Sequence, residues 1–332
     1  MGEQARSKRV AGLVAAFFLL ALAVLGPHVP VRALNSKVAT SKPKVTKPKP
    51  RAIKPGVVRS VPSTSRPAPT VTTSRLGPRT VTVSTGDLVE ASGCAVPVND
   101  PKTVWLHNDS GNAPMLFAFD LSSGKLRSVP VANATLVDWE DIAPLPGGGV
   151  VVGDIGDNDS TRESVQLYRI GDLASNPLTA VRQDLRYEDG PHNAEALVVD
   201  PRSPAASPDI FVITKDPTGH SMVYQAAGGV LKNVASVAIL GEALIFPNQI
   251  TAADALPDGS GVILRTYQYA YVYRKLATQP FVSAFASKPV RVTMPFLAQA
   301  EALCVLSDGS TAMTTTESRG SATIPFFFFP IP

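Results

Sequence analysis

Short apolar runs separated by turn signals fill the chain from Thr80 onward, without the 3.6-residue periodicity of long helices. Five runs begin alike and start about 50 residues apart: SGCAVPV at Ser92, WEDIAPL at Trp139, AEALVVD at Ala194, ITAADAL at Ile250 and AEALCVL at Ala300. Each is followed by a turn and by second and third apolar runs, and four also have a fourth: LRSVPV, VRQDLRY, VASVAIL and PVRVTM. The pattern predicts one antiparallel unit that repeats.

A four-stranded unit that repeats at this period is typical of a β-propeller blade. The sequence therefore predicts an all-β propeller of five four-stranded blades over residues 80–332. Six blades is the alternative, if a divergent blade lies in a long connection, whereas an open sandwich gives no reason for the period. The last unit shows three strands, and the alternating run TVTVST, Thr80 to Thr85, can supply the fourth. We expect this N-terminal strand to close the ring.

Ring closure also makes a prediction about the two cysteines of the chain, Cys94 and Cys304. They lie in the innermost strands of the first and last units, which become neighbours when the ring closes. We therefore expect a disulfide between them, which an oxidising compartment would allow. The alternative is a pair of buried thiols that behave as small apolar residues.

Polar residues recur where strands begin and end. In an antiparallel meander, the start of the first strand and the end of the second lie at the same rim. The first strands carry Glu140, Glu195 and Glu301 there, with Ser92 and Thr251 at the same position in the other units. The second strands end near further polar residues: Asn108, Asp109, Asp154, Asp157, Asn158, Lys215, Asp216, Arg265 and Glu317. One mouth of the propeller is thus expected to be rich in carboxylates.

Three interpretations of this mouth compete. The first is a divalent cation, above all Ca2+, which takes six to eight oxygen ligands; the predicted metal ligands are Glu140, Glu195, Glu301 and Asp154. The second is a small polar or anionic ligand, for which the predicted binding residues are Asn108, Asp109, Asp157, Asn158, Lys215 and Arg265. The third has no ligand: adjacent blades exchange salt bridges, such as Arg265 with Glu195 or Glu301. The sequence leaves the three open.

Charge divides the chain into parts. In residues 1–33, basic residues precede an apolar run from Val10 to Gly26, which is typical of a signal peptide, with an N-terminal membrane anchor as the alternative. Residues 34–79 hold eleven Lys or Arg and no acid, and their Pro-rich composition predicts a disordered linker that is either a tether or a cationic arm. Residues 80–332 hold 16 basic and 26 acidic residues, a net charge of −10. The overall pI near 9 therefore does not indicate nucleic-acid binding.

Several strings, in this order, resemble a group of exported bacterial β-propeller proteins of undetermined function: LHNDSG (106–111), WEDIA (139–143), GDIGDN (153–158), AEAL (194–197) and LPDG (256–259). The similarity spans about 85–320. More loosely, the acid at the start of an inner strand is similar to gluconolactonase-like and phytase-like propellers. That resemblance implies a calcium or related divalent ion at the channel mouth, used in ester, lactone or phosphoester hydrolysis. Ser92 and Thr251 depart from the pattern, and no catalytic base of those families can be placed here.

The sequence thus predicts a secreted or cell-surface β-propeller whose acidic mouth binds a divalent cation and a small polar ligand as a non-catalytic binding or scaffold module. We expect a monomer that meets a membrane only through its N-terminal segment, with a cell-wall polymer or a protein as partner and no nucleic acid. The alternative is a metal-dependent hydrolase, which needs an open coordination position and a base within hydrogen-bond reach. No GxSxG, P-loop or GxGxxG motif occurs to support other enzyme classes.

Overall fold

The computed structural model of the chain describes residues 78–239, 248–295, 297, 299–318 and 320–332. The predictions for the signal segment and for the linker up to residue 77 lie outside these residues. Within the described part, no helix is long and apolar enough to cross a membrane. The fold there is built almost wholly from β-strands, as predicted.

Consecutive strands pair antiparallel in units of four, which match the repeats of the sequence. The first unit is β2 (Ala91–Ala95), β3 (Thr103–Asn108), β4 (Met115–Asp120) and β5 (Leu126–Ala132). The second is β6 (Trp139–Pro144), β7 (Val150–Asp154), β8 (Val165–Ile170) and β10 (Val181–Tyr187). The third is β11 (Ala194–Val199), β12 (Ile210–Thr214), β13 (His220–Ala227) and β14 (Val230–Ala238).

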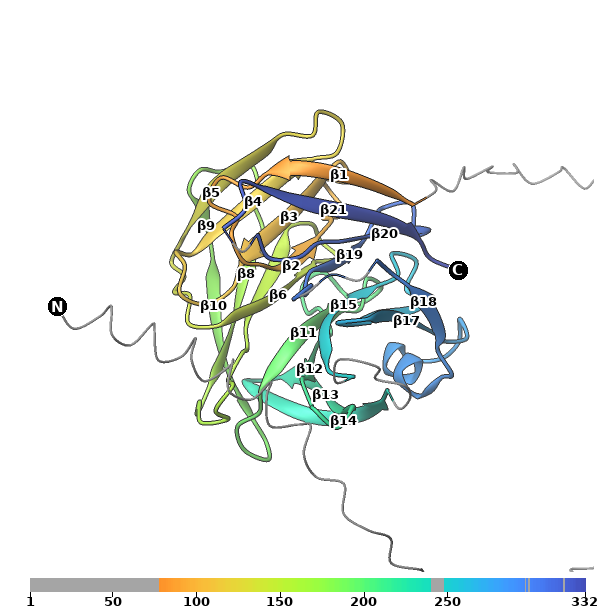
Figure 1. Ribbon diagram of the computed structural model, residues 1–332. Coiled ribbons are helices and arrows are strands. Elements are labelled where there is room, and N and C mark those ends of the chain that lie inside the picture. Colours follow the sequence, from red (N-terminus) through yellow and green to blue (C-terminus); the bar gives the residue numbers. More distant parts are fainter. Residues whose placement is uncertain (1–77, 240–247, 296, 298, 319) are drawn as a thin grey trace, which may run out of the picture. The chain divides into compact units, whose positions relative to one another are not determined.

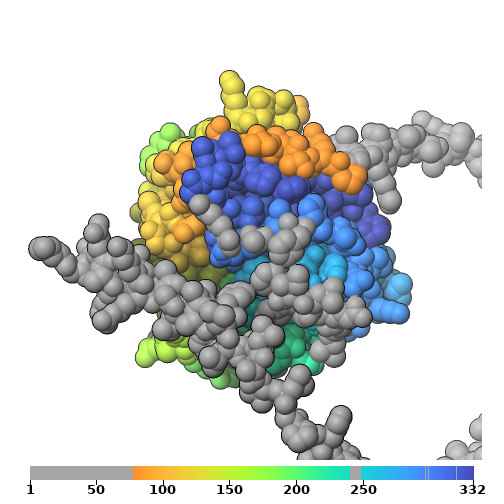
Figure 2. Space-filling view, viewed as in Figure 1, coloured from red at the N-terminus to blue at the C-terminus, as the bar shows by residue number. Residues whose placement is uncertain are grey.

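The remaining strands form two further sheets. The fourth unit is β15 (Ile250–Ala255), β16 (Gly261–Thr266), β17 (Tyr269–Arg274) and β18 (Val290–Thr293). The last sheet joins the two ends of the described chain: β19 (Leu303–Val305), β20 (Thr311–Thr314) and β21 (Thr323–Pro330) are completed by β1 (Arg79–Ser84). β1 lies along β21 in Figure 1, and Figure 2 shows the two segments adjoining on the surface. The predicted closure by the N-terminal strand is confirmed, with Val81 opposite Phe326.

The first strands of the units form a closed cycle, since each contacts the next: β2 with β6, β6 with β11, β11 with β15, β15 with β19, and β19 with β2. Every residue of β2 and of β11 is buried, whereas the outer strand β5 alternates buried and exposed positions. Strands covered on both faces read as continuous apolar runs, while half-covered strands alternate. Burial therefore falls from the axis of this propeller to its rim.

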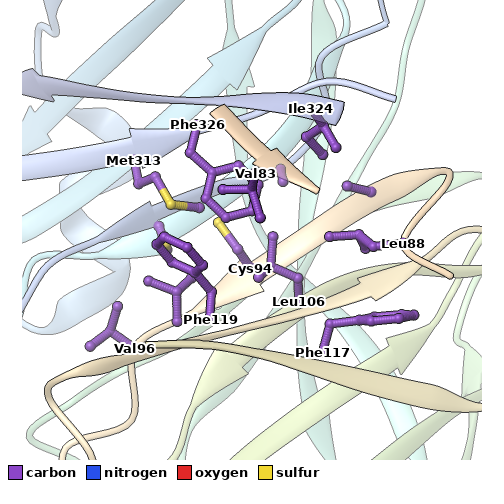
Figure 3. Close-up of a cluster of buried hydrophobic side chains, with 14 of the residues drawn as sticks. Val83, Leu88, Cys94, Val96, Leu106, Phe117, Phe119, Met313, Ile324 and Phe326 are labelled. Atoms are coloured by element: carbon purple, nitrogen blue, oxygen red, sulfur yellow. The ribbon is translucent and has the colours of Figure 1, made fainter. Parts of the chain in front are cut away.

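Each pair of neighbouring sheets encloses its own apolar core, and that of the closing pair is rich in phenylalanine. There Phe119 of β4 meets Phe326 of β21 edge to face, with ring centroids 4.8 Å apart. Figure 3 shows Cys94 among Val83, Met313 and Phe326, which come from both ends of the chain. Within the last sheet, the backbone hydrogen bond from Thr85 N to Ala322 O at 3.1 Å continues the pairing of β1 with β21.

Three features were not predicted. The two-residue strand β9 (Leu178–Thr179) pairs parallel with β5. Outer strands β10 and β14 also pair parallel, so the second and third units form one eight-stranded sheet. A 3-10 helix, η1 (Phe281–Ala286), precedes β18 and packs aromatic rings against Phe211 of β12. These elements depend on contacts between distant segments, which a local pattern does not record.

The two cysteines lie together, because β2 and β19 are neighbours at the closing seam. Both are fully buried free thiols in this structure, and a hydrogen bond joins them. Burial raises the pKa of both thiols above the usual value, which suppresses the reactive thiolate in the folded state. The disulfide remains a prediction.

We expect chain that folds in an oxidising compartment to carry the Cys94–Cys304 bond. Intact mass after alkylation in denaturant, without reductant, should then show no modified thiol. Adding reductant to unfolded chain before refolding should lower its stability by about 2–5 kcal/mol, because the bond closes a long loop. A Cys94→Ala, Cys304→Ala double variant should show no effect of reductant. Two alkylated thiols in exported protein would refute the bond.

Candidate cation site at the channel mouth

A β-bulge marks the start of the first strand in four units, at Ser92, Glu140, Glu195 and Thr251. The partner strand skips each of these residues in the pairing register. A bulge bends its strand and re-aims the side chain of the extra residue, and it recurs beside functional sites. Glu301 has the corresponding place just before β19. The predicted equivalence of these positions is therefore visible in the backbone, and we call this end of the ring the channel mouth.

Three carboxylates converge at the mouth: Asp109, Asp138 and Glu140 each bring one oxygen to within 4.8 Å of the others. Asp109 follows β3, Asp138 precedes β6, and Glu140 is the bulged residue of β6. Glu140 is 3% exposed, and Asp109 and Asp138 are half-buried. We call these three residues the carboxylate trio. Among the described residues, none of the salt bridges involves a member of the trio.

The charges of the trio oppose one another. Burial raises the pKa of Asp109 to about 6, with further contributions from Glu301 and Glu90. Burial also raises the pKa of Asp138 to about 6, and Asp109 adds to the shift. The pKa of Glu140 lies well above its usual value, again through burial and then through Glu195 and the other two members. Such shifts arise where carboxylates share a site without a counter-cation.

Gly156, in the GDIGDN string, leaves room for the trio. A Cβ at this position would overlap Glu140 Oε1 and Asp138 Oδ2. The Gly156 N–H donates to the carbonyl oxygen of Asp138 at 3.1 Å, which fixes the backbone against the two carboxylates. Ser92 Oγ donates to the Glu140 carbonyl oxygen at 2.7 Å and holds the neighbouring strand in place. The trio is thus a built cradle of oxygen atoms, the ligand type that hard divalent cations take.

The other two mouth glutamates have protein partners. Lys215 Nζ forms a salt bridge with Glu195 Oε1, while Glu195 Oε2 is buried with no hydrogen-bond partner among the described residues. Burial alone would lower the pKa of Lys215, but Glu195 raises it above the usual range and keeps the ammonium charged. Tyr267 Oη donates to Glu301 Oε1 at 3.4 Å, and Lys215 Nζ lies 5.6 Å from the centre of the Tyr267 ring. Lys215 thus neutralises part of the mouth.

Asp154, a predicted metal ligand, serves the loop that carries Asp138. Its two oxygens accept the backbone N–H groups of Val137 and Asp138, at 3.1 and 3.0 Å. Arg162 Nη2 donates to the same carboxylate at 2.8 Å. Asn108 has the equivalent role in the first unit, where its Oδ1 accepts two backbone N–H groups. The structure therefore places Asp154 beneath the trio as a positioning residue.

Arg265, a predicted ligand anchor, is fully buried between the fourth and last units. Its Nε donates to the Ala300 carbonyl oxygen at 2.9 Å and its Nη1 to Thr314 Oγ1 at 2.6 Å. Burial lowers its pKa to about 10. No salt bridge joins it to Glu195 or Glu301 in the described part of the chain, so the bridges expected in the ligand-free interpretation are not seen.

Asp157 and Asn158 hold the loop after β7. Asp157 Oδ2 accepts the Arg162 N–H at 2.8 Å, and Asp157 N donates to Asn193 Oδ1 at 2.9 Å. Asn193 Nδ2 donates to Asn158 Oδ1 at 3.2 Å. Of the predicted ligand-binding residues, Asp109 and Lys215 are therefore the ones whose side chains lie in the charged part of the mouth.

Asp138, Gly156 and Tyr267 were not singled out from the sequence. Asp138 lies just before β6 and Glu140 is bulged, so strand alternation in the sequence does not indicate that their side chains meet. Gly156 was visible inside GDIGDN, but its role depends on which side chains approach it. Tyr267 had no local signal, because its partner Glu301 is 34 residues away.

Comparisons with known proteins show the fold and no more. The sequence matches no family model and no curated protein. The major allergen Mala s 1 of Malassezia sympodialis has a similar structure: TM-score 0.51, 7% identity, 75% of this chain and 95% of that chain. An auxiliary nutrient-binding protein from Bacteroides thetaiotaomicron has TM-score 0.43 at 7% identity over 72% and 69% of the two chains. The RRP9 WD40 repeats have TM-score 0.40 at 10% identity over 73% and 67%.

Gly156→Ala should destabilise the protein by about 1–3 kcal/mol, because the added methyl group overlaps two carboxylates. Urea unfolding measures the change. Gly171→Ala is the matched control, since a Cβ there meets no atom within 4 Å. If the two variants are equally stable, the cradle is not tightly packed around Gly156.

The free energy of unfolding should fall as the pH rises, because the pKa values of Asp109 and Asp138 are raised in the folded state. Because Asp109 and Asp138 have a pKa of about 6 when folded and 3.8 ordinarily, the folded state binds more protons in that interval. Their contribution to stability is therefore largest at low pH and is lost as the pH rises through 6. With chelator present, Asp138→Asn should raise the thermal midpoint more at pH 7.5 than at pH 5. The control Glu163→Gln changes an exposed glutamate and should shift the thermal midpoint equally at the two pH values. An equal shift for Asp138→Asn at pH 5 and pH 7.5 would contradict the raised pKa of Asp138.

Proposed function

We propose that the protein is an exported, five-bladed β-propeller that binds a divalent cation, Ca2+ above all, at Asp109, Asp138 and Glu140. The observation that carries the proposal is the convergence of three carboxylates, one of them buried, none of which takes part in a salt bridge within the described part of the chain. A buried carboxylate is costly unless it is paired or coordinates a metal. A divalent cation would relieve the repulsion that raises the three pKa values.

The proposed ligand set differs from the one expected from the sequence. Glu195 is paired with Lys215, Glu301 accepts from Tyr267, and Asp154 accepts from Arg162. Glu140 remains, and Asp109 and Asp138 replace the others. The five blades of the proposal rest on the closed cycle of first strands, and export rests on the apolar run that follows the first basic residues.

The mouth favours a cationic or neutral partner over an anionic one. Five carboxylates, Asp109, Asp138, Glu140, Glu195 and Glu301, face one lysine, so a bound divalent cation leaves the mouth negative when all are ionised. Three carboxylates also supply fewer oxygens than the six to eight that Ca2+ takes. The open positions suit water or the hydroxyl groups of a neutral polar ligand. A hydroxyl-rich cell-wall polymer is the partner that this chemistry fits.

We favour a binding module over the hydrolase. A hydrolase needs a base beside the metal-bound water. His107 is the histidine closest in sequence to Asp109, and it is fully buried, with Nδ1 within 3.0 Å of the Asn108 carbonyl oxygen. Burial lowers its pKa to about 4, so it is neutral at pH 7. It lies in the core beside Gly93 and Trp139 and acts as a packing residue.

Calorimetry and thermal melting of the full chain with CaCl2 test the proposal. We expect a dissociation constant between about 10⁻⁵ and 10⁻³ M, in the range of weaker protein calcium sites. Glu140→Gln and Asp138→Asn should each abolish the heat and the rise in melting temperature, because each removes one of the three charges. Glu163→Gln, on an exposed glutamate, should leave both unchanged. Absence of binding by the folded wild type would overturn the proposal.

A further inference from the structure

The opposite end of the ring contains a second, chemically different cavity. It has a volume of about 170 Å³ and is lined where the first strands end. Val96, Val199, Ala255 and Val305 form its inner walls, and each is less than 8% exposed. Residues of all five units contribute to the lining, so the cavity lies on the ring axis, away from the carboxylate trio.

Prolines form much of the rim of this cavity: Pro97, Pro144, Pro201 and Pro257 come from four different units. Proline has no N–H group, so the rim is poor in hydrogen-bond donors. Its fixed φ also makes the rim stiff. Such a pocket is suited to an apolar group and offers little to an anion.

Asp254 is the one charged residue that lines the cavity. It is 3% exposed, and its two oxygens accept the backbone N–H groups of Ala255 and Val305, both at 2.8 Å. No salt bridge to it exists among the described residues. Ala95, Ala143, Val198 and Cys304 occupy the equivalent position in the other units. Asp254 is therefore the charged exception at a position that is apolar in the other four units. Such departures from a pattern tend to mark functional sites.

A second buried carboxylate, Asp141, provides an internal comparison. Its oxygens accept three backbone N–H groups, from Ile142 and Leu197 at 2.9 Å and from Ala253 at 3.3 Å. Asp141 does not line the cavity. A buried carboxylate with a purely structural role can thus accept three backbone N–H groups in this ring. Asp254 has two and retains acceptor capacity beside an apolar pocket.

We propose that this cavity binds a small organic cation, a protonated primary amine on a compact aliphatic body, with Asp254 as its counter-ion. The ammonium group would supply the N–H donors and the positive charge that the buried carboxylate lacks, and the valine and proline walls would cover the aliphatic part. Burial raises the pKa of Asp254 to about 7, so the carboxylate is ionised in mildly alkaline solution. This site is independent of the cation proposed at the channel mouth.

Titration calorimetry of the full chain at pH 8.5 tests the proposal, with cyclohexylammonium chloride as the probe. Cyclohexanol, its neutral counterpart, and sodium chloride are the reference titrants. We expect the amine to bind at least about tenfold more tightly than the alcohol, the value of a hydrogen bond to a charged group. Asp254→Asn should remove this difference while leaving cyclohexanol binding unchanged. Equal binding of amine and alcohol by the wild type, or undiminished amine binding by Asp254→Asn, would overturn the proposal.

A rim variant keeps the test valid if Asp254→Asn does not fold. Val98 lines the cavity and is 64% exposed, so it can be changed without touching the core. Val98→Trp should narrow the entrance and weaken amine binding, whereas Val98→Ala should not. Neither change should alter the response to CaCl2, because the trio lies at the other end of the ring. Amine binding that Val98→Trp leaves intact would place the amine elsewhere and refute the site.

Discussion

The seam between the first and last units is the constraint on which the ring depends. Two ends of the chain that are over 200 residues apart must meet there, and the loss of chain entropy on closing so long a loop is recovered only when the seam is formed. β1 supplies backbone pairing along β21, and an aromatic core fills the interface. The channel mouth is assembled by the same event, since Glu301 and Asp109 come from opposite sides of the seam.

The β-bulges direct polar side chains to the channel mouth. A regular strand start would alternate its side chains between two cores, as the outer strands alternate between core and solvent. The extra residue at Glu140 or Glu195 frees one side chain from that alternation and directs it to the axis. Because the equivalent position recurs in every unit, each unit can place a different group at the mouth. Ser92 and Thr251 place a hydroxyl there, and Glu140, Glu195 and Glu301 place a carboxylate. The fold fixes where these groups lie, and the sequence of each unit decides their chemistry.

The repeat itself could be read from the sequence because strand length, turn chemistry and alternation are local properties. Thr80 to Thr85 was identifiable as the closing strand for the same reason. The roles of the carboxylates were harder to predict, because Asp154 and Asp138 look alike in the sequence. Asp154 accepts backbone N–H groups, whereas Asp138 belongs to the carboxylate trio. Asp141 is a stronger case: its partners Leu197 and Ala253 lie 56 and 112 residues away. Whether a buried acid is satisfied depends on donors that only the closed ring brings together.

The parallel pairing of β10 with β14 makes the propeller mechanically uneven. Backbone hydrogen bonds from Arg186 to Gly229 and from Glu188 to Leu231 join the outer edges of the second and third units, in addition to the core between them. The first and second units are joined in the same way, since β9 of the second unit pairs parallel with β5 of the first. Backbone pairing at the outer edges therefore links the first three units to one another. Strain applied to the ring would separate the units elsewhere first. Among the described strands, β18, β1 and β9 are the outermost of their sheets, whereas β10 and β14 pair with each other over two residues.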